Sequence, residues 1–123
     1  MRTFIILAAL LFPMIGWAQD CEKFRTGTFV FDDESGQRMV GYSIKRGKRY
    51  QTEYFEGGKS KWKVNWTSDC TYTLTLVKSQ DINDLIGYTV TTRIIRTDED
   101  SYFCVVTSEY TPDKMRFTIH KVK

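Results

Sequence analysis

The side chains with the most chemistry to offer are three cysteines and a single histidine. Cys21, Cys70 and Cys104 are too far apart for the close pairs of a zinc site, and His120 is the only imidazole in the chain. His120 would act as a general base only beside a nucleophile. Cys104 is the one thiol candidate, but it lies in the apolar stretch 102–106, where its side chain is expected to point inward. We therefore expect no metal site and an ordinary exposed histidine.

Other signatures of catalysis are missing from the sequence. There is no glycine-rich phosphate loop and no Gly-x-Ser-x-Gly turn. The acidic runs 32–34 and 98–100 fall in expected turns, and their spacing matches no calcium-binding loop, so they are expected to be solvated charges. The sequence thus predicts a protein without enzymatic activity, metal or cofactor.

Residues 1–18 have the pattern of a signal peptide. Residues 4–12 are continuously apolar, and Gly16-Trp17-Ala18 places small residues where signal peptidase would cleave. The apolar run is about half of the roughly 20 residues that a membrane-spanning helix needs. A lipoprotein is the other alternative, but Asp20 stands before Cys21 where a lipobox requires a small residue. We expect a secreted or periplasmic protein that does not span the membrane, with one domain over residues 19–123.

Export would place the cysteines in a compartment that tolerates disulfides. An odd count allows one bridge and one free thiol. Cys21 and Cys70 both fall at the ends of expected strands, where side chains from different strands can meet. We predict a Cys21–Cys70 disulfide and a buried, inert Cys104.

Aromatic residues recur on the expected strands and could form a binding site. Inside a small barrel, aromatic side chains can wall an apolar pocket or simply fill the interior, and the sequence leaves both outcomes open. The candidate ligand-binding residues are Phe29, Trp62, Trp66 and Tyr72, with the segment 79–85 as a lid and a small apolar or amphipathic molecule as the ligand. The wider aromatic set consists of Phe31, Tyr42, Tyr50, Tyr54, Tyr88 and Phe117.

Basic residues suggest an alternative function on the outer surface. The basic stripe, as we call it, consists of Lys45, Arg46, Lys48, Arg49, Lys59, Lys61 and Lys63. On turns and solvent-facing sides of strands, these side chains could meet lipid headgroups, acidic polysaccharide or nucleic acid, or could simply be solvated. In this alternative the protein is an envelope or extracellular interaction protein whose protein partner is unknown. The formal net charge of +3 is too weak to indicate a nucleic-acid partner.

The elements that must position these residues are β-strands, because apolar and polar residues alternate with a period of two. The alternation is clearest over residues 59–76, which read as a hairpin. Pairing Trp66 with Cys70 would place Val64 opposite Tyr72 and Trp62 opposite Leu74, so that one face of the hairpin is apolar.

Similar stretches continue along the chain and predict eight short strands. Alternation places Phe29 and Phe31 on one face, Val40, Tyr42 and Ile44 on the inner face of 38–46, and Tyr50, Thr52 and Tyr54 together on 49–55. The remaining strands are expected at 86–96, 102–110 and 114–122. Eight strands in successive hairpins with no long helix predict an all-β, up-and-down, lipocalin-like barrel, with a two-sheet sandwich as the alternative.

Two resemblances accompany this pattern. Thr26-Gly-Thr-Phe29, followed by a chain of hairpins, resembles the start of calycin barrels such as lipocalins, fatty-acid-binding proteins and avidins, which implies ligand binding in the barrel. Cys21-x-Lys-Phe, Gly-x-Phe29, Gln51-Thr-Glu and Trp66-Thr-Ser-Asp-Cys-Thr-Tyr-x-Leu74 resemble a family of short exported proteins from Bacteroidetes-type bacteria. That family has no established activity, so this second resemblance implies export and a common fold only.

Overall fold

The computed structural model describes residues 20–80 and 85–123. The predicted signal peptide and residues 81–84 of the predicted lid lie outside these ranges. Within the described residues, no helix is long and apolar enough to cross a membrane.

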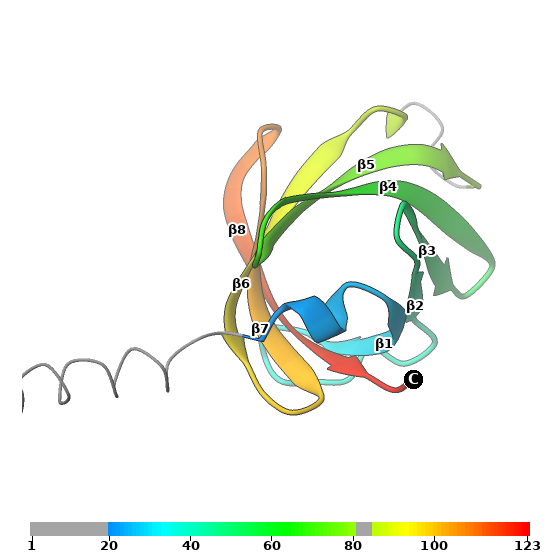
Figure 1. The fold of residues 1–123 in the computed structure, drawn as a ribbon. Coiled ribbons are helices and arrows are strands. Elements are labelled where there is room, and N and C mark those ends of the chain that lie inside the picture. Colours follow the sequence, from blue (N-terminus) through cyan, green and yellow to red (C-terminus); the bar gives the residue numbers. More distant parts are fainter. Residues whose placement is uncertain (1–19, 81–84) are drawn as a thin grey trace, which may run out of the picture.

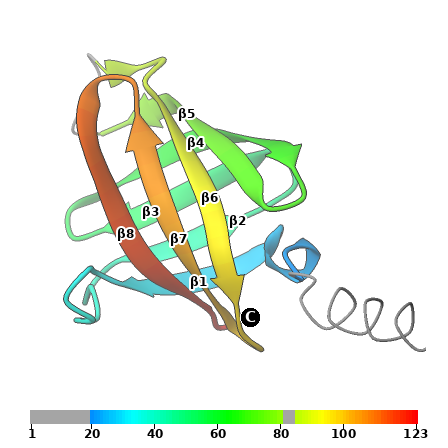
Figure 2. The same ribbon diagram turned by 90° about the vertical axis from the view of Figure 1, so that its left-hand side faces the viewer.

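Eight antiparallel strands close into one up-and-down barrel (Figures 1 and 2). Each strand pairs with its neighbours in the sequence, and β1 also pairs with β8 to close the ring. The predicted fold is therefore confirmed, and the sandwich alternative is wrong. The elements are η1 (Glu22–Phe24), β1 (Gly27–Asp32), β2 (Ser43–Arg46), β3 (Tyr50–Phe55), β4 (Gly58–Ser68), β5 (Thr71–Ser79), β6 (Thr89–Thr97), β7 (Ser101–Ser108) and β8 (Thr111–Lys121).

The short 3-10 helix η1 closes one end of the barrel. In the end-on view of Figure 1 it lies within the ring of strands. Its last residue, Phe24, is completely buried and packs against Tyr102, with ring centroids 5.1 Å apart. The opposite end, which we call the mouth, carries the connections β1–β2, β3–β4, β5–β6 and β7–β8.

The β4–β5 hairpin has the predicted faces but a different register. Trp66 pairs with Tyr72, Val64 with Leu74 and Trp62 with Leu76, two residues away from the predicted pairing. The chain turns at Asp69-Cys70, and an irregularity between Trp66 and Ser68 inserts an extra residue into β4. A slip of two residues keeps every side chain on its face, which is why the apolar face survives the correction.

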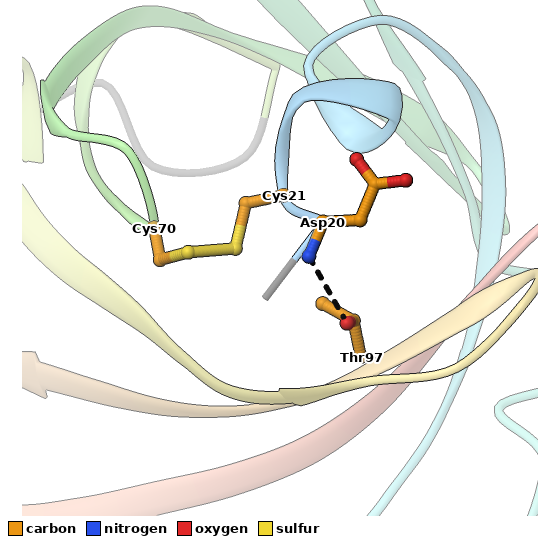
Figure 3. Close-up of a disulfide and its surroundings, with 4 residues drawn as sticks. All are labelled: Asp20, Cys21, Cys70 and Thr97. Atoms are coloured by element: carbon orange, nitrogen blue, oxygen red, sulfur yellow. Dashed lines mark hydrogen bonds between the residues drawn. A yellow bond between two sulfur atoms is a disulfide. The ribbon is translucent and has the colours of Figure 1, made fainter. Parts of the chain in front are cut away.

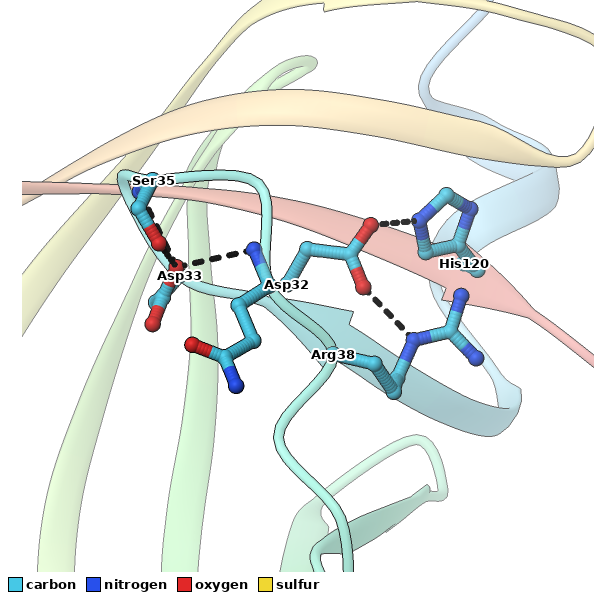
Figure 4. A network of polar contacts seen from close by, with 6 residues as sticks. Asp32, Asp33, Ser35, Arg38 and His120 are labelled. Carbon is cyan, nitrogen blue, oxygen red and sulfur yellow. Dashed lines mark hydrogen bonds and ion pairs between the residues drawn. The ribbon is translucent and has the colours of Figure 1, made fainter.

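The predicted second strand is wrong over its first half. Residues 38–42 are not part of β2, and Val40 is 86% exposed and Tyr42 41% exposed. The Asp33 carboxylate accepts hydrogen bonds from the backbone N–H groups of Ser35 and Gln37 and from the Ser35 hydroxyl (Figure 4). These local bonds favour a turn over a strand ladder, so the segment becomes a loop at the mouth.

Candidate functional site

The barrel interior is filled at one end and hollow at the other. Next to η1, Phe24, Phe29, Tyr102 and Cys104 are at most 1% exposed. Beyond them, toward the mouth, lies a cavity of about 260 Å³. One water needs only about 10–15 Å³, so this cavity has room for a small organic molecule, although it is slightly smaller than the roughly 300–1,000 Å³ of typical ligand pockets.

The cavity wall is mainly apolar, and every strand contributes to it. Met115 belongs to the wall and is 48% exposed, so the cavity extends to the rim of the mouth. The apolar side chains that carry the argument below are Phe31, Leu74, Val90, Val106, Phe117 and Ile119. Both outcomes that the sequence left open therefore occur, each in its own half of the barrel.

A buried arginine forms the floor of the cavity. Arg46 is 2% exposed, and its guanidinium makes four hydrogen bonds. Nε donates to Oε1 of Gln51 at 2.7 Å, and Nη1 donates to the carbonyl oxygen of Phe24 at 2.8 Å. Nη2 lies 3.0 Å from the hydroxyls of both Tyr72 and Tyr102, which lie 2.7 Å from each other. One side chain thus connects β2, β3, β5, β7 and η1.

Aromatic rings surround the same guanidinium. Its carbon lies 4.6 Å from the ring centroids of both Phe29 and Tyr72, within the range of a cation–π interaction. The assignment of Arg46 to the outer basic stripe is therefore wrong. Arg46 follows Ile44 by two residues and shares its inward face, because the alternation of β2 continues to its last residue.

The floor continues along β3 as a polar strip. Gln51 is 1% exposed; its amide accepts from Arg46 and donates to Oε2 of Glu53 at 2.9 Å. Glu53 is half-buried in the cavity wall. Burial raises the pKa of the Glu53 carboxyl above its ordinary value, although the Gln51 amide and the Arg46 charge act in the opposite direction.

The predicted ligand-binding residues divide into two groups. Trp62 and Tyr72 line the cavity, and the Trp62 indole N–H donates to the Ser60 hydroxyl at 2.9 Å. Phe29 lies in the filled half beneath Arg46. Trp66 lies toward the closed end, with its ring 4.6 Å from that of Tyr72. The guanidinium carbon of Arg25 lies 4.8 Å from the centroid of the Trp66 ring, so Trp66 packs against Tyr72 and Arg25 and does not line the cavity.

A second space of about 220 Å³ adjoins the cavity at the mouth. Glu53, Trp62 and Tyr88 line both spaces, so they form the boundary between them. Leu85, from the predicted lid segment, lines the outer space. Residues 81–84 of that segment lie outside the described chain.

The polar residues of the cavity were not among the predicted site residues. Attention to aromatic side chains favours Tyr50 and Tyr54 on β3, but these are 44% and 40% exposed on the outside of the barrel. The inward residues are the intervening Gln51 and Glu53. The pairing of β3 with β4 could have identified them. Trp62 points inward and pairs with Gln51, and directly paired residues lie on the same face of the sheet.

The rest of the basic stripe lies on the outer surface. Lys45, Lys48, Arg49, Lys59, Lys61 and Lys63 are all exposed. Lys61 lies over the ring of Tyr50 at 4.3 Å. Lys59 and Lys61 also line an outer groove with Lys78.

His120 lies on the outer face of β8, as predicted, but it is not simply solvated. Its Nε2 lies 2.7 Å from Oδ2 of Asp32, and Nε of Arg38 donates to Oδ1 of the same carboxylate at 2.6 Å (Figure 4). The bonds from Arg38 and then His120 lower the pKa of Asp32. The arrangement ties the mouth loop to the outside of the barrel, and no nucleophile lies among its partners within the described chain.

The predicted disulfide between Cys21 and Cys70 is confirmed (Figure 3). The two Cα atoms are 5.4 Å apart, within the usual range for a disulfide. The bridge joins the residue before η1 to the β4–β5 turn, and the backbone N–H of Asp20 also donates to the Thr97 hydroxyl on β6 at 3.4 Å. The helix η1, which closes this end of the barrel, is therefore attached covalently to the barrel wall through the disulfide.

Cys104 is the free cysteine, and it is fully buried in the filled half of the barrel. Burial raises the pKa of its thiol to about 12. At pH 8 the thiolate fraction would then be on the order of one in ten thousand, and the thiolate is the reactive form. We expect no thiol to react with Ellman's reagent in the native protein at pH 8, and one thiol to react after unfolding in guanidinium without reductant. A reactive thiol in the native protein would contradict this placement.

Comparisons with known proteins return no relative. No family model, no curated protein and no solved structure matches this chain.

Proposed function

We propose that this protein binds a small amphipathic molecule inside the barrel. The observation that carries the proposal is the cavity of about 260 Å³, which reaches the mouth on one side. Arg46, hydrogen-bonded to the Phe24 carbonyl oxygen of η1, forms its floor on the other side. Deep pockets that are mainly apolar and contain a few placed polar groups are the usual form of a small-molecule site. Burial of an apolar ligand surface there would supply the binding free energy at about 25 cal/mol per Å².

Cavity binding is favoured over a role for the basic stripe. Arg46, one of its members, lies in the interior, and the remaining members are exposed lysines and one arginine such as most protein surfaces carry. Arg46, Gln51 and Glu53 are connected by hydrogen bonds in the cavity wall, as expected of a preformed binding site. The proposed activity is binding without catalysis.

Export of the protein to the periplasm or the exterior is part of the same proposal. A disulfide that anchors η1 suits an oxidising compartment. A binding protein there would take up its ligand from the periplasm or the medium.

Two adjacent valines on β7 allow a matched test. Val106 lines the cavity and Val105 lies on the outer side of the same strand, so Val106→Trp fills the cavity and Val105→Trp does not. With the neutral dye N-phenyl-1-naphthylamine as the probe, we expect saturable fluorescence enhancement in the wild type. We expect at least a tenfold loss of affinity in Val106→Trp and no change in Val105→Trp. Thermal unfolding of each variant would establish that it is folded, and equal dye binding by the two folded variants would contradict the proposal.

A further inference from the structure

The two walls of the cavity differ in polarity. Arg46, Gln51 and Glu53 form a polar strip on the β2–β3 side. The facing wall, from β5 to β8, is mainly apolar and includes Leu74, Val90 and Val106. A bound molecule would therefore turn an apolar surface toward β5–β8 and a polar group toward β3. The inference that follows rests on the proposed function and concerns the chemistry of that polar group.

The charges in the cavity balance. Among the described residues that line it, Arg46 and Glu53 are the only charged ones. Gln51 connects them, because it accepts from Arg46 through Oε1 and donates to Glu53 through Nε2. This chain orients the Gln51 amide between a positive and a negative group, so each charge has its counterpart within the wall. Burial of a further charge in this environment would leave it without a counter-ion, which costs several kcal/mol.

Most polar atoms of the strip are already engaged. All three nitrogens of Arg46 donate hydrogen bonds, and aromatic rings lie against its guanidinium. Both polar atoms of the Gln51 side chain are used. Glu53 uses Oε2, whereas its Oε1 has no hydrogen-bond partner among the described residues. Glu53 also lies at the boundary between the cavity and the outer space at the mouth.

We propose that the ligand is electrically neutral and carries a hydroxyl or amide group that donates a hydrogen bond to the free carboxylate oxygen of Glu53. Its apolar part lies against the β5–β8 wall. The ligand class is thus that of neutral amphipathic molecules such as alcohols and amides. Carboxylates and ammonium compounds of similar shape are disfavoured, because either one adds an unbalanced charge to the cavity.

The proposal can be tested with three probes that share one tail. 1-Octanol, octane-1-sulfonate and octylammonium have neutral, negative and positive head groups, and their charges remain constant between pH 7 and 8. Each would be titrated against the complex with N-phenyl-1-naphthylamine at pH 8, and its affinity taken from dye displacement. We expect 1-octanol to bind at least tenfold more tightly than either charged probe. Tighter binding of a charged probe would overturn the proposal.

The variant Glu53→Gln should change the preference. The amide oxygen can still accept from Gln51, whereas an NH2 group replaces the free oxygen. The change therefore removes the negative charge and leaves Arg46 unbalanced. We expect octane-1-sulfonate to gain at least tenfold in affinity and octylammonium to weaken. Glu56→Gln, in the exposed β3–β4 turn, is the matched control and should leave all three affinities unchanged. An unchanged ranking in a folded Glu53→Gln variant would overturn the proposal, and if that variant does not fold, the wild-type ranking decides alone.

Failure of this inference and failure of the proposed function give different results. If the dye binds and Val106→Trp abolishes its binding, the cavity is a binding site whatever the ranking of the octyl probes. A wrong ranking, or no displacement by any of them, then overturns only the inference about Glu53. If Val106→Trp leaves the affinity for the dye unchanged, both the proposed function and the inference about Glu53 are overturned.

Discussion

Replacement of Arg46 by methionine is expected to lower the free energy of unfolding by about 3–5 kcal/mol. Methionine has a similar length and is apolar, so the change removes the charge and its donors without opening a large void. Total stabilities of small domains are only about 5–15 kcal/mol, so this loss would be a large fraction of the whole. Denaturant titration followed by circular dichroism would measure it through the midpoint at constant slope.

The size of the effect follows from the hydrogen-bond partners that lose their donor when the guanidinium is removed. Gln51 Oε1 and the Phe24 carbonyl would lose their donor inside the barrel, where an unsatisfied polar group costs about 1–3 kcal/mol. The hydroxyls of Tyr72 and Tyr102 would keep each other as partners, at 2.7 Å. Glu53 would keep a negative charge in the wall with no positive counterpart, which raises the pKa of its carboxyl further.

Lys45→Met is the matched control, because Lys45 precedes Arg46 in the same strand and is exposed. We expect it to change the stability by no more than about 0.5 kcal/mol. Arg46→Lys keeps the charge but cannot place donors toward β3, β5, β7 and η1 at once, so an intermediate loss is expected. If Arg46→Met were as stable as the wild type, the cluster would be a replaceable polar core, as some buried ion pairs are.

Arg46 also shows where prediction from the sequence stopped. Strand alternation was sufficient for the all-β class and for the inward face of residues such as Phe29, Val64 and Leu74, since a strand needs only its own sequence to reveal two faces. It could not by itself distinguish a closed barrel from a two-sheet sandwich, because that depends on the pairing of β1 with β8. Arg46 sits among Lys45, Lys48 and Arg49, and a charged residue in such a run is normally solvated. Three of its four acceptors are 22, 26 and 56 residues away, on elements that meet only when the barrel closes.

The cavity was beyond prediction for a related reason. Its volume depends on how side chains from eight strands pack together, and no local sequence pattern predicts that packing. The aromatic residues gave a correct indication of the interior for Trp62 and Tyr72, which line the cavity. The same reasoning could not predict that Trp66 packs near the closed end of the barrel, because that packing depends on Arg25 and on the position of η1.

Loss of the disulfide is the other change with a large expected effect. The double variant Cys21→Ala/Cys70→Ala should lose about 4 kcal/mol, because the bridge closes a chain segment with a sequence separation of 49 and removes that freedom from the unfolded state. The disulfide also anchors η1, whose Phe24 is completely buried and whose carbonyl oxygen accepts from Arg46.

Reduction of the wild type provides the internal control for this prediction. Treatment with dithiothreitol should lower the stability of the wild type to that of the double variant and leave the variant unchanged. Because Cys104 is the only other thiol and is not bridged, any effect of the reductant on the wild type belongs to Cys21–Cys70. Equal stability of the oxidised wild type and the double variant would contradict the prediction. It would mean that the packing of Phe24 and its bond to Arg46 hold η1 in place without the covalent link.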